Sequence, residues 1–66
     1  MKIYINKEEH LIEKNYSITE LIEYLKIDAR GMAVAIDNKV VPKSNWDLKK
    51  VEDDQKLTFI RATQGG

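Results

Sequence analysis

The two glycines at the carboxyl end of the sequence, Gly65 and Gly66, are the residues best suited to chemistry. They follow the small or polar residues Ala62, Thr63 and Gln64, which come directly after a strand-like segment. Glycine has no Cβ, so it adopts most backbone conformations and allows a close approach to the main chain. The pattern predicts a chain that presents its own carboxylate, ionised at neutral pH because terminal carboxyls titrate near ~3.3.

Side-chain groups offer little competition for this role. The sequence has no cysteine, which excludes a thiol nucleophile, a thiolate metal site and a disulfide. His10 is the one histidine, so it lacks a second ligand or a catalytic partner, and we expect it on the surface of a strand. Glu52, Asp53 and Asp54 are expected in a solvated turn, with Asp54 bonding the turn amides. We expect no bound metal.

The composition is that of one small globular domain. Hydrophobic residues make up 42% and charged residues 33% of the 66 residues, and 11 basic side chains balance 11 acidic ones. Without net positive charge or a basic cluster with interleaved aromatic residues, nucleic-acid binding is not expected. The apolar runs are far shorter than the ~20 residues that span a bilayer. We expect a cytoplasmic protein without membrane association, and a monomer when alone.

The amino-terminal part has the pattern of a strand hairpin. Residues 1–6 alternate apolar and polar side chains, which directs every second side chain from Met1 onward to a core. Residues 9–14 can return as the second strand. The pattern leaves open whether Leu11 or Ile12 points inward.

A helix begins at the clearest local signal in the sequence. The Ser17 side chain can accept a hydrogen bond from the Glu20 amide, while the Glu20 carboxylate accepts one from the Ser17 amide. The helix is expected to end near Lys26 or Ile27. Its apolar stripe comprises Ile18, Leu21, Ile22 and Leu25.

Three further strands are expected after the helix. Residues 32–37 and 56–61 have strand composition, and residues 40–41 form a short strand that Pro42 confines to a sheet edge, because proline cannot donate to a ladder. Trp46 is expected in a single helical turn, closing the open end of the core. One helix covering one face of a sheet is a two-layer α+β fold.

Four segments of the sequence match a known family. They are Ala35-Ile36-Asp37, Val41-Pro42-Lys43-Ser44-Asn45-Trp46, the acidic turn ending in Asp54, and Ala62-Thr63-Gln64-Gly65-Gly66. On these segments, and over its whole length, the chain resembles the ThiS family, the sulfur carrier proteins of thiamine biosynthesis. Two positions depart from the pattern, since Asp53 stands where glycine is usual and Thr63 where valine is frequent. The resemblance implies a ubiquitin-like β-grasp fold, a mixed sheet packed on one helix, for residues 1–61, with a flexible tail at residues 62–66.

The resemblance also implies that the protein is a carrier rather than an enzyme. The Gly66 carboxylate would be adenylated by an E1-like enzyme of the ThiF type, which consumes MgATP; the carrier itself would bind no cofactor. A sulfur source such as a cysteine desulfurase would then supply the sulfur of a thiocarboxylate, and thiazole synthase of the ThiG type would receive it. Gly65, Gln64, Thr63 and Ala62 would thread a partner's active site.

Docking to these partners is expected on the sheet face away from the helix. If Leu57 and Phe59 point inward, their neighbours point outward. The expected docking face comprises Ile60, Thr58, Tyr4, Ala33 and Ala35. An exposed apolar patch of this kind often marks a partner site, and Ile60 and Tyr4 are the expected anchors.

Two other classes of function remain open on the sequence alone. The first is a ubiquitin-like carrier or modifier of another pathway, such as molybdopterin synthesis, tRNA thiolation or cysteine synthesis. The second is a small enzyme, although the sequence has no nucleophile–base pair and no cofactor motif.

Overall fold

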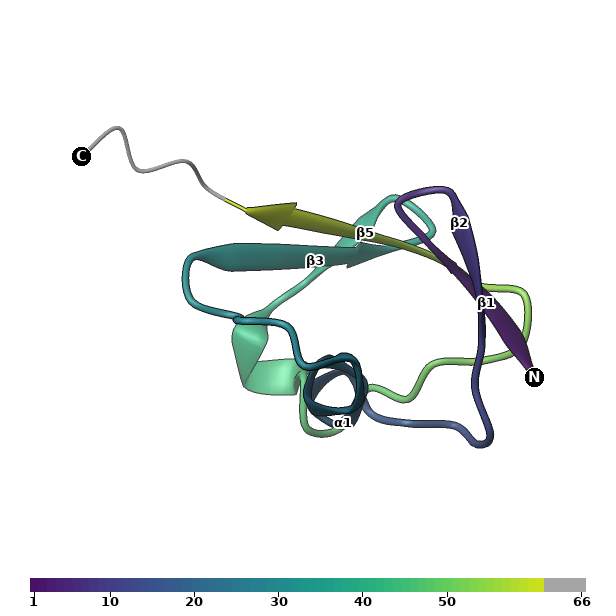
Figure 1. The fold of residues 1–66 in the computed structure, drawn as a ribbon. Helices are drawn as coiled ribbons and strands as arrows, with labels where there is room; N and C mark the ends of the chain where they lie inside the picture. Colours follow the sequence, from purple (N-terminus) through teal and green to yellow (C-terminus); the bar gives the residue numbers. More distant parts are fainter. Residues whose placement is uncertain (62–66) are drawn as a thin grey trace.

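The computed structural model describes residues 1–61, and residues 62–66 lie outside the described part. Its sheet has the strand order β2-β1-β5-β3-β4. The helix covers one face of this sheet and leaves the other face open (Figure 1). The elements are β1 (Lys2–Ile5), β2 (Glu8–Leu11), α1 (Ile18–Leu25), β3 (Met32–Ile36), β4 (Lys39–Val41), the short 3-10 helix η1 (Lys43–Asn45) and β5 (Lys56–Arg61).

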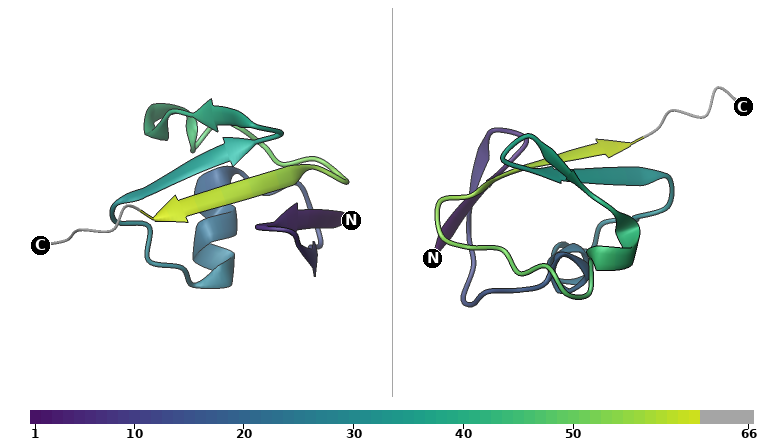
Figure 2. Two further views of the ribbon diagram at one scale, coloured as in Figure 1. Left: turned by 90° about the horizontal axis from the view of Figure 1, so that it is seen from above. Right: turned by 180° about the vertical axis from the view of Figure 1, so that it is seen from behind.

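The first and last strands, β1 and β5, are neighbours in the middle of the sheet and run parallel. All other strand pairs are antiparallel, and Figure 2 shows β3 running against β5. This is the ubiquitin-like β-grasp arrangement, so the predicted fold class is confirmed. In this register Leu57 lies between Ile5 of β1 and Ile36 of β3, and all three side chains are buried.

Both hairpins close with two residues in the left-handed conformation. Asn6 and Lys7 have φ values of 51° and 73°, and Asp37 and Asn38 have values of 50° and 71°. Positive φ at both central residues is typical of type I′ turns, whose twist matches that of the flanking strands. Asn and Asp tolerate this region better than other non-glycine residues do, so they can replace the usual glycine.

The register of the first hairpin settles the orientation that the sequence left open. The two-residue turn brings Lys2 opposite Leu11, and residues opposite each other share a face of the sheet. Leu11 therefore points to the open face and is 75% exposed, whereas Ile12 is buried. Ile12 also exchanges two backbone hydrogen bonds of 2.8 Å with Met1, which extends the pairing past β2.

The predicted helix cap is present in full. The amide of Glu20 donates to Ser17 Oγ at 3.1 Å, and the amide of Ser17 donates to Glu20 Oε1 at 2.9 Å. At the other end Lys26 has a φ of 59°, and its N–H donates to the carbonyl of Glu23 at 3.1 Å. The helix therefore ends where the sequence predicts.

The core lies between α1 and the inner face of the sheet. Trp46 is 5% exposed, and its indole N–H donates to the carbonyl of Val41 at 3.0 Å, which confirms that it closes one end of the core. Pro42 follows β4, which is an edge strand as expected. The other buried members of the core cluster are Ile3, Ile5, Ile12, Ile18, Leu21, Ile22, Val34, Ile36, Val51 and Leu57.

The acidic turn before β5 uses a different carboxylate from the one expected. The side chain of Asp54 makes no hydrogen bond among the described residues, so that prediction was wrong. Instead Asp53 Oδ1 accepts from the amide of Lys2 at 2.8 Å. Asp54 has a φ of 68°, and its backbone N–H donates to the Lys2 carbonyl at 2.6 Å. The turn thus binds β1 through the Asp53 side chain and the Asp54 main chain.

Replacing Ser17 by alanine should lower the free energy of unfolding by about 1 kcal/mol, because the Glu20 amide loses its acceptor at the first turn. Urea denaturation of native and variant protein measures the difference. Ser44→Ala is the matched control, since Ser44 is exposed in η1 and its side chain has no hydrogen bond among residues 1–61. Equal stability of the two variants would contradict the role of the cap.

Glu20 should also make stability depend on pH. The hydrogen bond from the Ser17 amide lowers the pKa of Glu20 below its ordinary value. The folded state therefore binds this proton less readily than the unfolded state, so the contribution is present above about pH 4.3 and is lost as the pH falls through the folded pKa. NMR titration of the Glu20 carboxyl carbon checks the direction. A midpoint at or above the ordinary value would refute it.

Candidate functional site

The predicted carrier residues, Ala62, Thr63, Gln64, Gly65 and Gly66, lie outside the described residues. The structure describes the chain up to the point where they begin, at Arg61, the last residue of β5. Two features of the site can therefore be built from the described residues. They are the support around the end of β5 and the open face of the sheet beside it.

The two edges of β5 are supported unequally. On one edge the antiparallel pairing with β3 continues to the end of the strand, where Met32 lies opposite Arg61. On the other edge the parallel pairing with β1 ends at Leu57. Beyond it, Asn6 Oδ1 accepts from the Phe59 amide at 2.9 Å, and Asn6 Nδ2 donates to the Phe59 carbonyl at 3.3 Å. Nothing in the local sequence pattern predicts this contact, because Asn6 and Phe59 are 53 positions apart.

A small basic cluster lies at the same end of β5. Arg61 Nη1 donates to the carbonyl of Arg30 at 3.3 Å. The guanidinium of Arg30 holds the carboxylate of Asp28, with its Nη2 2.8 Å from Asp28 Oδ2 and its Nε 3.1 Å from Asp28 Oδ1. The hydrogen bonds from Arg30 hold the pKa of Asp28 well below its usual range. Asp28 is thus an ionised partner for Arg30. Arg61 directly precedes residues 62–66, the predicted carrier residues, in the sequence.

The residues expected to form the docking face all lie on the open face of the sheet, but one of them, Ala35, is buried. Ile60 is 53% exposed, and Thr58 and Ala33 are exposed beside it. Tyr4 is half-buried, with Lys2 Nζ 5.6 Å from its ring centroid. Ala35 is only 7% exposed, so it contributes little surface of its own.

Two apolar side chains that the sequence analysis did not assign extend this surface. Val40 lies opposite Ala35 and is 72% exposed, and Leu11 lies opposite Lys2 on β2 and is 75% exposed. The strand register of the two hairpins places both side chains on this face. We use the term open face for the exposed or half-buried residues Tyr4, Leu11, Ala33, Val40, Thr58 and Ile60.

A hollow on the open face crosses the two hairpin turns. It has a volume of about 590 Å³, and its lining includes Tyr4, Asn6, Asn38 and Thr58. Lys7 and Lys56 also line it, and neither forms an ion pair within the described residues. The open face therefore has apolar residues towards the end of β5, and the two lysines lie at its margin near the first hairpin turn and the start of β5.

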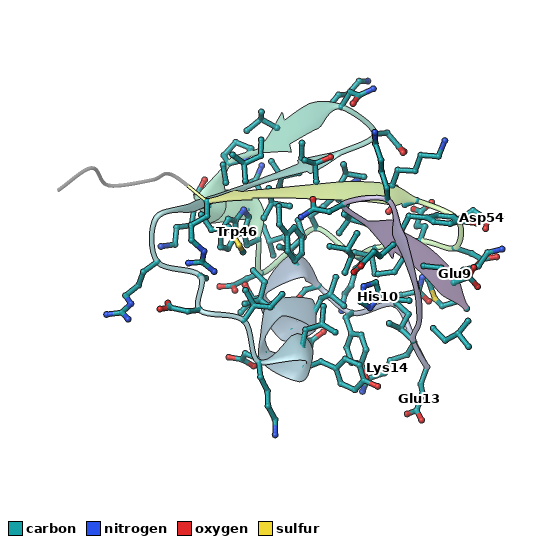
Figure 3. All side chains as sticks on the ribbon, turned by 45° about the horizontal axis from the view of Figure 1, so that its top comes forward. Glu9, His10, Glu13, Lys14, Trp46 and Asp54 are labelled. Carbon is teal, nitrogen blue, oxygen red and sulfur yellow. The ribbon has the colours of Figure 1, made fainter. Side chains whose placement is uncertain are left out.

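The other chemical candidates are separated from one another. His10 of β2 lies opposite Ile3 of β1 and is half-buried. It lines a hollow together with Glu8 and Arg61. Figure 3 shows it apart from Trp46 and Asp54. Residues 1–61 contain no cluster of three or more His, Cys, Asp or Glu side chains placed to hold a metal ion. No helix within residues 1–61 is long and apolar enough to cross a membrane.

Two known proteins are similar to this chain in sequence over all 66 residues. The chain is 33% identical over all 66 residues to a thiazole synthase of Paramagnetospirillum magneticum, of whose length these residues span 20%. It is 27% identical, over the full length of both chains, to the sulfur carrier protein ThiS of Escherichia coli.

Solved structures show the same fold. The crystal structure of the thiamine biosynthesis protein ThiS from Geobacter metallireducens matches with a TM-score of 0.89 and 23% identity, over the full length of both chains. The solution structure of a thiamine biosynthesis protein from the same organism matches with a TM-score of 0.79 and 22% identity, covering this whole chain and 88% of the other. The sequence pattern of the ThiS family matches residues 2–66, including both terminal glycines, and the chain belongs to the ThiS family.

Proposed function

We propose that this chain is a sulfur carrier protein of thiamine biosynthesis, and that the carboxyl group of Gly66 carries the sulfur. The observation that carries the proposal is the match of residues 2–66 to the ThiS family, because it includes Gly65 and Gly66. The full-length similarity to the Escherichia coli sulfur carrier protein supports it. The chain is then a protein co-substrate, which acts in the cytoplasm and moves as a monomer between its partners.

The chemistry takes place on the main chain. An oxygen of the Gly66 carboxylate attacks the α-phosphate of MgATP held by an E1-like adenylating enzyme, and pyrophosphate leaves. A persulfide sulfur, supplied by a cysteine desulfurase, attacks the acyl carbon and displaces AMP. Cleavage of the sulfur–sulfur bond by a thiol then leaves a thiocarboxylate on Gly66 and a disulfide on the donor side. The role of this chain is to present the carboxylate without side chains near the reacting carbon.

The distance between the folded domain and Gly66 suits this task. Five residues follow Arg61, and a fully extended chain spans ~3.3–3.6 Å per residue, so Gly66 reaches about 17 Å beyond β5. The folded domain can therefore stay docked on the surface of a partner while Ala62, Thr63, Gln64 and Gly65 pass into its active site.

The open face is the proposed docking surface for both partners. It carries the exposed apolar side chain of Ile60 near the end of β5, and the charged residues Lys7, Glu9 and Lys56 lie at its margin near the start of that strand. Thiazole synthase is the proposed acceptor of the sulfur. In the Paramagnetospirillum magneticum relative, a segment similar to this whole chain is part of a polypeptide named thiazole synthase, which supports a partnership between the two activities.

Incubation with the adenylating enzyme of the same organism, MgATP and a sulfur donor should increase the intact mass by the replacement of one oxygen with sulfur. The control is a chain lacking Gly66, which should show no increase. Mass spectrometry of both proteins gives the result. An unchanged mass with a partner that is demonstrably active would overturn the proposed carrier site.

A thiocarboxylate alone does not identify the pathway, because carriers for molybdopterin synthesis, tRNA thiolation and cysteine synthesis use the same group. Transfer to thiazole synthase separates them. Thiazole formation that depends on the sulfurised chain supports the proposal, and transfer only to a different acceptor would assign the chain to another pathway.

Ile60→Asp should weaken binding to the adenylating enzyme by tenfold or more, since truncating or charging a central apolar contact costs about 2 kcal/mol. Leu48→Asp is the matched control, because Leu48 is also exposed, at 77%, but belongs to the segment between η1 and β5. Isothermal calorimetry measures both affinities, and circular dichroism verifies the fold. Equal affinities of the two variants would remove Ile60 from the docking face.

A further inference from the structure

The side chain of Asn6 takes the place of a missing strand beside β5. Its amide group accepts from the N–H of Phe59 at 2.9 Å and donates to the carbonyl of the same residue at 3.3 Å. A neighbouring strand would offer one acceptor and one donor to these two groups in the same way. The Asn6 side chain thus continues the hydrogen bonding between β1 and β5 beyond Ile5, where β1 ends and the chain turns into β2.

This contact is the last support on that edge within the described residues. In the pairing of β1 with β5, Tyr4 lies opposite Lys56 and Ile5 lies opposite Leu57. The backbone N–H of Asn6 adds one hydrogen bond to the Leu57 carbonyl. From Phe59 onward the opposite edge is paired with β3, so without Asn6 the end of β5 would be held from one side only. A strand held on one edge can change its twist more easily than a strand held on two.

Few other residue types could serve both purposes at this position. The backbone of Asn6 has a φ of 51°, which asparagine tolerates well, and its side chain carries a donor and an acceptor on one planar group. Asp37 occupies the same place in the second hairpin, and its Oδ1 accepts from the Lys56 amide at 3.2 Å. A carboxylate suffices there because the Asp37 amide itself donates to the Lys56 carbonyl at 2.8 Å.

We propose that Asn6 is a positioning residue for the carrier reaction. By holding Phe59 it sets the direction in which β5 delivers the residues after Arg61 to a partner's active site. A partner has to bind the open face and receive the residues after Arg61 at the same time, so the direction of β5 at Arg61 fixes where those residues enter the partner. Displacements of about 1 Å at a reacting centre already cost up to ~100-fold in rate. The inference rests on the proposed carrier function.

The test compares two substitutions of the same kind. Asn6→Gly keeps the left-handed turn and removes the contact with Phe59. Lys26→Gly is the matched control, because Lys26 also has a positive φ, of 59°, is exposed at the end of α1, and makes no side-chain hydrogen bond among the described residues. Asn6→Asp is intermediate, since it keeps the acceptor for the Phe59 N–H but replaces the donor to the Phe59 carbonyl.

Hydrogen exchange of the isolated protein gives the first readout. The backbone N–H of Phe59 should exchange about tenfold faster in Asn6→Gly than in Lys26→Gly, and near the native rate in Asn6→Asp, because its acceptor is lost only in the first variant. Equal exchange in the two glycine variants would show that Asn6 does not hold this strand. This readout needs no partner, so it decides the structural part of the inference whatever the function is.

Kinetics with the adenylating enzyme and a sulfur donor give the second readout. For Asn6→Gly we expect the rate of thiocarboxylate formation at saturating carrier to fall about tenfold, with a smaller change in the half-saturating concentration because the apolar residues of the open face are unchanged. Asn6→Asp should lie between the glycine variant and the native chain. Unfolding free energies of all variants show whether a loss merely follows unfolded protein.

Each other outcome overturns part of the account. Equal maximal rates for Asn6→Gly and Lys26→Gly, or a loss confined to the half-saturating concentration, would show that Asn6 is a turn or docking residue and not a positioning one. A native chain that no active adenylating enzyme converts would overturn the proposed function itself. A native chain that is converted, with equal rates in both variants, would leave that function in place and remove only the inference about Asn6.

Discussion

The position of β5 between β1 and β3 is the constraint on which the rest of the structure depends. In this register Leu57 lies in one row with Ile5 and Ile36, and the three side chains form the middle of the core under α1. A shift by one residue would turn Leu57 outward and Thr58 inward, because successive side chains of a strand point to opposite faces. One register therefore determines the core, the open face and the place where the chain leaves the sheet.

Much of this fold follows from local patterns in the sequence. The Ser17 and Glu20 pair defines the start of the helix because each side chain meets an amide only three residues away. Pro42 marks an edge strand for an equally local reason, the missing N–H. The parallel pairing of β1 with β5 joins segments about 50 residues apart in the sequence, so no local pattern contains it, and the family resemblance was needed to predict it.

The features that the sequence did not predict depend either on the register of a hairpin or on contacts between distant segments. Leu11 joins the open face through its pairing in the hairpin, which depends on a two-residue turn without glycine. Asp53 rather than Asp54 reaches the Lys2 amide, because the backbone of Asp54 turns left-handed there. The second role of Asn6 arises in the same way, through a residue 53 positions away. The roles of residues 62–66 stay predictions, since those residues lie outside the described part.

The left-handed turns also leave room to engineer a more heat-resistant version of this protein. Six non-glycine residues within residues 1–61 have positive φ, and the two lysines among them, Lys7 and Lys26, lack the short polar side chain that eases this conformation. An L-residue pays roughly 1 kcal/mol there that glycine does not. Both lysines are exposed and lie outside the core. Lys26 lies at the end of α1, so a thermostable variant could be built there with the proposed docking surface left in its native form, whereas a change at Lys7 would also alter the margin of that surface.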